Sequence, residues 1–395
     1  MKLLLLFTCV VFLNCILGIQ GQDKPKKHVV CYFSSWTVYR PGNGKFDVEN
    51  VDPSLCTHIN FAFVGLKEDG SVNVLDSWQA DKDGLNGINR LLELRNVKKD
   101  LKILVSMGGW NEGSEVYSKV AANETTRKIL ANNVLKFIEE RGFDGFDLDW
   151  EYPGLRGGNE TTDKDNFTAL LKELSEVLKS RGLLLTTAVA GAVEKIDVSY
   201  DVAEVSKVVD MINVMVFDYH GSFDNFVGHV SPLYPAKIDF NFPDNETYNV
   251  DTALQHWLNK GADPQKINLG IVLYGRSFTL ADKTNTSLYA PIIEGGKEGP
   301  FSRQSGILGY NEICAFHNNG TYVWDDEQKV PHRIYDEDQW VGFEDERSVQ
   351  HKVDYALKNN LGGIMVWSLD YDDFRGTCGE KYPLLTTINK ALNLL

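Results

Sequence analysis

The chain has 395 residues, of which 24% are charged and 11% aromatic, a composition typical of a globular protein with a substantial core. Its formal net charge of -15 argues against nucleic acid or an acidic lipid surface as a partner, because both attract clustered Lys and Arg. We therefore expect a neutral or cationic substrate. A monomer is the default expectation, because no feature of the sequence argues for an interface.

The amino-terminal segment has the pattern of a secretory signal. An apolar run over residues 3–17 follows a charged start and precedes small residues at Gly18 and Gly21. This pattern predicts a signal peptide over residues 1–21 that is cleaved near Gly21. An uncleaved membrane anchor is the alternative, but Asn14 interrupts the run, which is shorter than the roughly 20 apolar residues that span a bilayer comfortably. We expect a secreted, extracellular protein that does not contact a membrane after cleavage.

In an oxidising compartment, the cysteines that follow the signal segment can form disulfides. Their even number predicts two disulfides, although arithmetic alone allows three pairings and does not choose between them. The same compartment makes the Asn-x-Ser/Thr sequons candidate sites of N-glycosylation on exposed loops. The cysteines are Cys31, Cys56, Cys314 and Cys378, and the sequons begin at Asn123, Asn159, Asn166, Asn245, Asn285 and Asn319.

Short apolar or β-branched runs alternate with longer stretches of helical periodicity, which is the pattern of parallel strands joined by crossover helices. Between the fourth and fifth runs, apolar residues recur at helical spacing over residues 167–178 and predict such a helix. Eight strand–helix units favour a closed (β/α)8 TIM barrel of the α/β class over an open sheet, which would leave exposed edges. The runs begin near Val29, Thr57, Leu101, Phe143, Leu183, Met211, Ile267 and Gly363.

The gap between the seventh and eighth runs is far longer than one helix needs. It contains short alternations of polar and apolar residues, such as TYVWDD and QWVGFED. This pattern predicts an α+β subdomain, inserted at about 276–346 into a catalytic barrel that occupies residues 22–395. We expect the subdomain to form a wall on one side of the site.

The fourth run carries three acids at alternate positions, Asp147, Asp149 and Glu151, with apolar residues between them. Side chains alternate along a strand, so the acids project to one face. In an antiparallel sheet this alternation usually means a solvated acidic face. In a parallel barrel the acids would point inward, where crowding raises the pKa of at least one of them. Barrel chemistry lies at the carboxyl ends of the strands, so these acids are the leading candidates for catalysis.

The order Asp144-x-x-Asp147-x-Asp149-x-Glu151 resembles the signature of the chitinases of glycoside hydrolase family 18. The resemblance runs from about His28 to the end of the chain, and it implies the disulfides Cys31–Cys56 and Cys314–Cys378. It implies no cofactor and no metal, and the sequence has neither a metal-ligand spacing of His with Cys nor a Gly-rich phosphate loop. Three further motifs resemble the same family: Ser106-Met107-Gly108-Gly109-Trp110, Tyr274-Gly275-Arg276-Ser277-Phe278 and Met365-Val366-Trp367-Ser368.

The resemblance implies that Glu151 protonates the glycosidic oxygen of chitin or a chitooligosaccharide while the substrate's own N-acetyl carbonyl attacks the anomeric carbon. This route retains configuration and needs no enzyme nucleophile. Asp149 would orient the acetamido group with support from Asp147, Asp218 completes the catalytic set, and Asp144 is structural. The resemblance implies that the substrate is contacted by Tyr32, Phe63, Ser77, Trp78, Gly108, Gly109, Trp110, Asn111, Tyr152, Met215, Val216, Phe217, Asp218, Tyr274, Arg276 and Trp367.

Aromatic residues near the strand ends offer surfaces on which the apolar face of a sugar ring can stack. For any one of them alone, core packing is the competing interpretation. Trp110 and Trp367 are favoured for sugar stacking by their motifs, and Trp367 resembles the residue that forms the floor beneath the sugar next to the scissile bond. The candidates are Tyr32, Trp36, Phe63, Trp78, Trp110, Phe223 and Trp367.

One position departs from the family pattern. The family usually has Met-x-Tyr-Asp where this chain has Met215-Val216-Phe217-Asp218. In the family, that tyrosine is thought to hydrogen-bond the acetamido oxygen as it attacks. Losing such a donor costs on the order of a hundredfold in rate and leaves sugar binding nearly intact. Tyr219 follows on the same expected strand face but lies too far along to substitute.

Two hypotheses of different class follow, an endo-acting chitinase and a lectin-like relative that binds chitooligosaccharides with little or no cleavage. Glu151 favours the enzyme, because relatives without activity typically lack this acid, whereas Phe217 favours the binding protein. A third hypothesis is a glycosidase of other N-acetylhexosamine glycans. It is less favoured, because the stacking aromatics suit a linear polymer.

Overall fold

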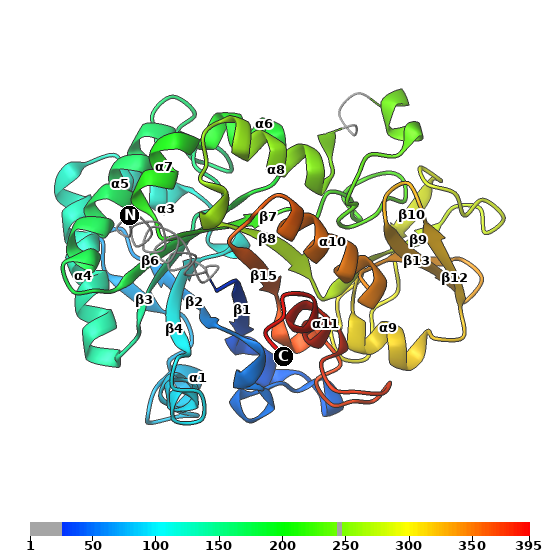
Figure 1. Ribbon diagram of the computed structural model, residues 1–395, viewed down its shortest axis with the longest axis horizontal. Helices are drawn as coiled ribbons and strands as arrows, with labels where there is room; N and C mark the ends of the chain where they lie inside the picture. Colours follow the sequence, from blue (N-terminus) through cyan, green and yellow to red (C-terminus); the bar gives the residue numbers. More distant parts are fainter. Residues whose placement is uncertain (1–25, 243–246) are drawn as a thin grey trace, which may run out of the picture.

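The computed structural model describes residues 26–242 and 247–395, so the predicted signal segment and Asn245 lie outside the described residues. Eight parallel strands form a closed barrel in which the last strand pairs with the first (Figure 1). The predicted (β/α)8 barrel is confirmed, with a strand at each of the eight predicted runs. In chain order the barrel strands are β1 (His28–Ser34), β2 (His58–Leu66), β4 (Lys102–Gly108), β5 (Gly145–Asp149), β6 (Leu184–Ala190), β7 (Met211–Met215), β8 (Ile267–Val272) and β15 (Gly363–Trp367).

Helices surround the barrel (Figure 1). The predicted crossover helix is α5 (Asp163–Lys179), which buries Phe167, Leu170, Leu171, Leu174 and Leu178 as the spacing requires. In the part of the chain that the structure describes, no helix is long and apolar enough to cross a membrane. The other helices are α1 (Ser77–Ala80), α2 (Gly87–Glu93), α3 (Glu115–Ala121), α4 (Glu124–Arg141), α6 (Val193–Ser199), α7 (Val202–Val208), α8 (Val250–Asn259), α9 (Tyr310–Phe316), α10 (Glu346–Lys358) and α11 (Pro383–Ala391).

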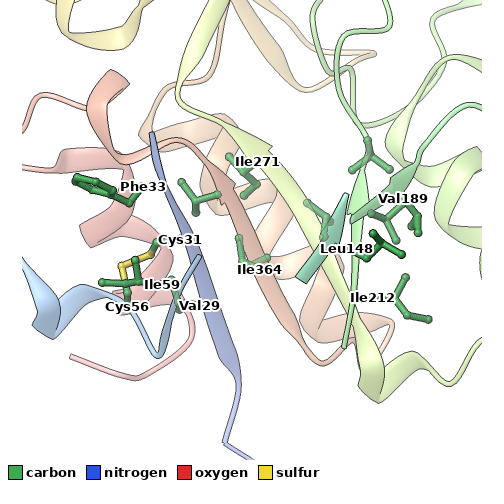
Figure 2. Close-up of a cluster of buried hydrophobic side chains, with 14 of the residues drawn as sticks. Val29, Cys31, Phe33, Cys56, Ile59, Leu148, Val189, Ile212, Ile271 and Ile364 are labelled. Carbon is green, nitrogen blue, oxygen red and sulfur yellow. A yellow bond between two sulfur atoms is a disulfide. The ribbon is translucent and has the colours of Figure 1, made fainter. Parts of the chain in front are cut away.

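The alternation of side chains along each strand divides the core into two parts. Outward-facing residues form one large apolar cluster between the strands and the helices, which we call the outer core. It includes Val29, Ile59, Leu148, Ile212 and Ile364 (Figure 2). Inward-facing residues form a smaller cluster, which we call the inner cluster. It contains Val30, Tyr32, Ala62, Met211 and Met365. The remaining inward positions include polar side chains, and these surround the acids of β5.

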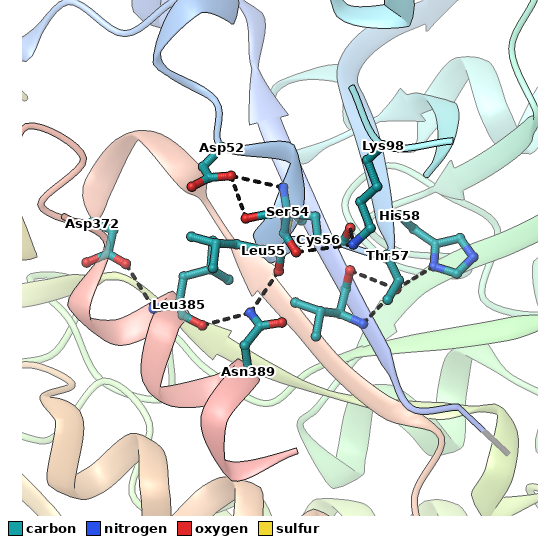
Figure 3. Close-up of a disulfide and its surroundings, with 12 residues drawn as sticks. Asp52, Ser54, Leu55, Cys56, Thr57, His58, Lys98, Asp372, Leu385 and Asn389 are labelled. Carbon is teal, nitrogen blue, oxygen red and sulfur yellow. Dashed lines mark hydrogen bonds between the residues drawn. A yellow bond between two sulfur atoms is a disulfide. The ribbon is translucent and has the colours of Figure 1, made fainter. Parts of the chain in front are cut away.

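Both disulfide pairings that the resemblance implies are confirmed. Cys31 of β1 is bonded to Cys56 just before β2, and Cys314 of α9 is bonded to Cys378 just before α11. Around Cys56, Lys98 Nζ donates to the Cys56 carbonyl at 2.8 Å, and Asn389 Nδ2 of α11 donates to the Leu55 carbonyl at 2.8 Å (Figure 3). The first and last parts of the described chain are thus joined on one side of the barrel.

A second, antiparallel sheet lies beside the barrel and is consistent with an inserted subdomain (Figure 1). Its central strand continues almost directly from barrel strand β8, so the sheet begins two residues earlier than position 276. Its strands are β9 (Tyr274–Leu280), β10 (Ile292–Gly295), β11 (Ile307–Gly309), β12 (Thr321–Asp325), β13 (Val330–Tyr335) and β14 (Gln339–Gly342). A short strand, β3 (Val72–Val74), pairs with β2 in antiparallel fashion and was not predicted.

Candidate active site

The three acids of the β5 segment all lie inside the barrel. Asp147 is 0% exposed, Asp149 is 3% exposed and Glu151, just beyond the carboxyl end of the strand, is 9% exposed. The apolar residues between them belong to the outer core. The inward orientation inferred from the alternation is therefore correct, and the burial excludes a solvated acidic face.

Asp147 is held by hydroxyl and amide donors from four other strands. Tyr32 and Ser106 donate to its Oδ2 at 2.7 Å each, and Thr186 and Asn213 donate to its Oδ1 at 2.6 and 3.4 Å. Burial raises the pKa of the Asp147 carboxyl, and these hydrogen bonds oppose the shift. A carboxylate with this many neutral donors can remain ionised in the interior.

Asp149 lies between two other acids and lacks such support. Its Oδ1 is buried without a hydrogen-bond partner among the described residues. Burial raises the pKa of Asp149 well above its ordinary value, and the negative charges of Glu151 and Asp147 raise it further. The three acids therefore cannot all carry a charge at neutral pH.

Glu151 has the pKa of a proton donor that works near neutrality. Burial raises the pKa of this carboxyl to about 7, although a hydrogen bond from Tyr152 and the positive charges of Arg156 and Lys195 lower it. Brønsted behaviour favours an acid whose pKa lies near the working pH. Glu151 can therefore give a proton to a group bound at the carboxyl end of the barrel.

Two cations near Glu151 were not singled out in the sequence. The Arg156 guanidinium lies 3.5 Å over the Trp110 ring, and its Nη1 donates to the backbone oxygens of Trp110 and Glu151 at 2.8 and 3.0 Å. Lys195 Nζ lies 5.4 Å from the centre of the Tyr152 ring. No periodicity or motif used above distinguishes either residue, because each lies in a segment beyond a strand end.

The end of β4 brings Trp110 close to the acids. Gly108 and Gly109 have φ angles of 124° and 87°, which residues with a side chain rarely adopt. A Cβ on Gly108 would lie 1.9 Å from the Asp149 carbonyl oxygen, and one on Gly109 would lie 2.6 Å from the Phe63 ring. The glycines of this motif therefore allow the backbone of β4 to approach β5, and Trp110 and Asn111 follow as exposed residues.

An aromatic cluster surrounds Trp367 at the end of β15. The Trp367 ring lies 5.3 Å from Tyr32, 5.7 Å from Phe63 and 6.2 Å from Trp36. Trp36 is 44% exposed, while Tyr32 is fully buried and donates to Asp147. The structure thus joins four of the aromatic candidates to the acids in one cluster.

The segment after β7 leaves the strand geometry at once. Asp218 has a φ angle of 56°, so the alternation that places Phe217 in the barrel does not continue to Tyr219. Tyr219 packs in the outer core and donates to the carbonyls of Gly191 and Asn249 at 3.2 Å each. Tyr219 therefore faces away from Phe217. The expectation that it shares the face of Phe217 is wrong, and what keeps it from substituting is its place in the outer core rather than its distance along the strand.

The other residues of this segment divide between site and core. Met215 and Phe217 pack against the inner cluster, and Val216 is fully buried in the outer core. The Val216 side chain therefore lies away from the inner cluster. Asp218 Oδ1 accepts hydrogen bonds from Tyr274 Oη and Arg276 Nε, both at 2.7 Å. This pairing connects the end of β7 to the first strand of the second sheet.

The remaining candidates lie at the edges of this arrangement. Ser77 and Trp78 begin the short helix α1, and Trp78 is 60% exposed. Phe223 is 63% exposed, and the Arg276 guanidinium lies 5.9 Å from its ring. Asp144, expected to be structural, lies before β5 and binds Arg95 at 3.0 Å and the backbone nitrogen of Ile103 at 2.9 Å.

Sequence reasoning missed the inward-facing donors Ser106, Thr186 and Asn213 as site residues. Their signal was available, because polar residues at inward positions of predicted strands need a buried partner. For a metal ion, the one close His, Cys, Asp or Glu grouping within residues 26–242 and 247–395 is Cys314, Asp373 and Cys378. Its sulfurs are joined in a disulfide, so it offers no thiolate.

Comparisons with known proteins agree with these observations. Residues 28–372 match the model of the glycosyl hydrolases family 18. The chain is 41% identical over 376 residues to "Probable chitinase 10" of Drosophila melanogaster. The match covers 92% of this chain but 16% of that protein. It is 38% identical over 403 residues to "Probable chitinase 2" of the same species, covering 93% and 81%.

Solved structures of two chitinase-related proteins are also similar to this chain. A Group IV chitinase of Ostrinia furnacalis, solved in complex with allosamidin, is 41% identical with a TM-score of 0.89, and the match covers 93% of this chain and 99% of that one. Human YKL-39, described as a pseudo-chitinase with retained chitooligosaccharide binding, is 35% identical with a TM-score of 0.85 and coverage of 93% and 100%.

Proposed function

The chain belongs to the glycosyl hydrolases of family 18 and is a glycosidase, and we propose on this premise that it hydrolyses β-1,4-linked N-acetylglucosamine polymers. The substrates are chitin and chitooligosaccharides, and cleavage is endo-acting. The observation that carries this proposal is Glu151, a buried carboxyl at the carboxyl end of β5 whose pKa is raised to about 7. Such a group can be protonated before the reaction and ionised after it.

In the proposed first step, the Glu151 proton moves to the glycosidic oxygen and the bond between that oxygen and the anomeric carbon breaks. The carbonyl oxygen of the sugar's own N-acetyl group bonds to the anomeric carbon from the opposite face. Water then opens the resulting cyclic ion and returns a proton to Glu151. The two displacements retain the configuration of the sugar.

The environments of Asp147 and Asp149 support this route. Asp147 is surrounded by four donors and has no free access to a substrate, so its proposed role is to hold a fixed negative charge beside Asp149. The unpartnered Oδ1 of Asp149 can accept the acetamido N–H and stabilise the positive charge that develops there. Asp218, fixed by Tyr274 and Arg276, offers a further polar contact.

The aromatic surfaces support a polymeric substrate. Trp367 and its neighbours provide a floor beside the acids, and Trp78, Trp110 and Phe223 are more than half exposed around it. Sugar rings stack on such surfaces without strict hydrogen-bond requirements. Binding along several exposed rings suits a chain that extends on both sides of the cleaved bond, and therefore endo-acting cleavage.

One observation favours a second candidate function, a binding protein with weak or no cleavage. Phe217 lies in the inner cluster where the family usually has a tyrosine, and it has no hydroxyl to hydrogen-bond the attacking acetamido oxygen. The intact acids favour the enzyme. The loss of one such donor lowers a rate by about a hundredfold, which slows an enzyme without abolishing it.

Hydrolysis of a fluorogenic N-acetylchitotriose derivative by the purified mature protein tests the proposal, with Glu151→Gln assayed beside it. We expect turnover by the wild type and a loss of at least about a thousandfold in Glu151→Gln. Retained oligosaccharide binding by Glu151→Gln in calorimetry is the control for folding. Binding without turnover in the wild type would move the assignment to the binding protein.

We also propose that the protein is secreted and N-glycosylated. Two disulfides suit an oxidising compartment, and the sequon residues Asn123, Asn159, Asn285 and Asn319 are exposed, whereas Asn166 is partly buried within α5. The intact mass of secreted protein, before and after removal of N-glycans, tests both points. A mature chain that still begins at Met1 would contradict cleavage near Gly21.

A further inference from the structure

The segment that follows Glu151 turns back and places one side chain over Trp110. The Arg156 guanidinium carbon lies 3.5 Å from the centre of the indole ring, and Nη1 bridges the backbone oxygens of Trp110 and Glu151. One planar group therefore contacts both the exposed ring and the backbone of the proposed acid. A guanidinium can stack on the ring and donate two hydrogen bonds at the same time.

The conformation of this segment is fixed from several sides. Arg156 has a φ angle of 51°, and Gly154 and Gly157 also have positive φ angles. A residue with a side chain rarely adopts this region, so surrounding contacts must hold it there. Asp163 supplies such contacts, because its buried Oδ2 accepts the backbone N–H groups of Gly154 and Asn159 at 3.2 and 2.7 Å.

Asp163 is in turn held by a neighbouring helix. Ser118 of α3 donates to Asp163 Oδ1 at 2.7 Å, and Asp163 is 0% exposed. The backbone on both sides of Arg156 is thus anchored to α3 and α5. Trp110 remains 56% exposed, although the guanidinium lies against its ring. The arrangement leaves indole surface free for a sugar while it restrains the rotation of the ring.

We propose that Arg156 is a positioning residue that holds the Trp110 ring at a fixed orientation to Glu151, so that the indole is a preformed platform for a sugar ring next to the cleaved bond. The inference rests on the proposed function. Without Arg156, the exposed indole loses rotational freedom only when substrate binds, and this ordering weakens binding. The guanidinium acts on the substrate through Trp110 and on the acid through its charge.

Two substitutions separate these effects. Arg156→Lys keeps the charge but loses the planar stack, so we expect KM for chitotetraose and longer chains to rise about two- to fivefold. The kcat and the basic limb of the pH profile should stay near the wild-type values. Arg156→Gln also removes the charge that lowers the pKa of Glu151, so the basic limb should move to higher pH as well.

The control is Arg141→Lys. Arg141 also lies over an aromatic ring, 5.4 Å from Phe137, and pairs with Asp81, but it lies on α4 away from the acids. We expect its kinetics to match the wild type. In a Trp110→Ala background, Arg156→Lys should give no further rise in KM. An equal rise in both backgrounds would overturn the role assigned to Arg156.

Calorimetry with chitotetraose in the Glu151→Gln background separates failure of this inference from failure of the proposed function. No binding by Glu151→Gln itself, together with no turnover by the wild type, would count against the proposed function. Binding by Glu151→Gln that is unchanged in Glu151→Gln/Arg156→Lys would overturn the positioning role alone. We expect about two- to fivefold weaker binding by the double variant.

Discussion

The Tyr32 hydroxyl donates to Asp147 Oδ2 at 2.7 Å, although 115 positions separate the two residues in the sequence. The bond crosses the barrel interior from β1 to β5 and places a buried phenol between the Trp367 ring and the acids. Burial and the neighbouring negative charges raise the pKa of Tyr32 well above its ordinary value, so it is a donor at any working pH.

Tyr32→Phe removes this donor and leaves the ring in place. The charged form of Asp147 loses one of its hydrogen bonds, so the pKa of Asp147 rises and the fixed negative charge beside Asp149 is weakened. We expect kcat to fall by about 10- to 100-fold with KM nearly unchanged, measured on the fluorogenic trisaccharide. Tyr322→Phe is the matched control, because Tyr322 donates to Asp345 at 2.7 Å in an exposed part of the second sheet. Equal kinetics for Tyr32→Phe and the wild type would contradict this role.

Phe217→Tyr restores the missing hydroxyl at the end of β7. Gly270 makes room for this ring, because a Cβ there would lie 2.9 Å from Phe217 Cε1, and the ring, like that of Trp367, packs against the inner cluster. We expect kcat to rise by about tenfold or more, towards the hundredfold of one transition-state donor. Phe217→Leu, which adds no hydroxyl, should not raise the rate. A Phe217→Tyr variant no faster than the wild type would show that a hydroxyl at this position does not assist the reaction.

The barrel and its acids could be predicted because their signals are local. Each barrel strand is a short apolar run, and the alternation of Asp147, Asp149 and Glu151 with apolar residues fixes their common face once the strand is parallel and buried. Burial also explains why the predicted rise in pKa occurs. The pairing of the four cysteines followed from the family resemblance rather than from the residues themselves.

The parts that could not be predicted depend on backbone turns after strand ends. Arg156 lies over Trp110 from a turn in which its own φ angle is positive, and no pattern of apolar residues encodes such a turn. The positive φ angle of Asp218 likewise redirects Tyr219 to the outer core. The three-residue strand β3 is too short to show periodicity, and its pairing with β2 is a tertiary contact.

The buried pair of Lys352 and Glu344 gives a prediction about stability. Both side chains are 0% exposed, and Lys352 Nζ donates to Glu344, to the Ser231 carbonyl at 2.6 Å and to the Ser231 hydroxyl at 2.7 Å. Lys352→Met leaves Glu344 charged and buried without its cation, so we expect the free energy of unfolding in urea to fall by about 3–5 kcal/mol. Lys352→Met/Glu344→Gln should recover much of this loss. A Lys352→Met variant as stable as the wild type would contradict this prediction.

The raised pKa of Glu151 also predicts the pH dependence of the reaction. The proposed mechanism needs this carboxyl protonated, and its pKa is about 7, so kcat/KM should fall as pH rises through about 7. The fall should approach tenfold per pH unit on the basic side, as for loss of one proton. The measurement is kcat/KM from pH 4 to 9 on a neutral substrate. A profile that stays flat to pH 9 would exclude Glu151 as the acid.

The same shift makes Glu151 a source of instability at alkaline pH. Its pKa rises from an ordinary 4.5 in the unfolded chain to about 7 in the folded protein, so between these values the folded state binds more protons than the unfolded state. The contribution of Glu151 to the free energy of unfolding therefore falls as pH rises through this window, by about 3 kcal/mol in total. Glu151→Gln cannot ionise and is free of this loss.

We therefore expect Glu151→Gln and the wild type to unfold at nearly the same temperature at pH 4, and Glu151→Gln to unfold a few degrees higher at pH 8. Thermal denaturation of both proteins across this range measures the difference. Glu176→Gln is the control, because Glu176 is an exposed residue of α5 and should give no such divergence. Parallel curves for Glu151→Gln and the wild type from pH 4 to 8 would mean that the Glu151 pKa is not raised. In that case the pKa of Glu151 would have to be raised by the bound substrate, and not by the burial of Glu151 in the free protein.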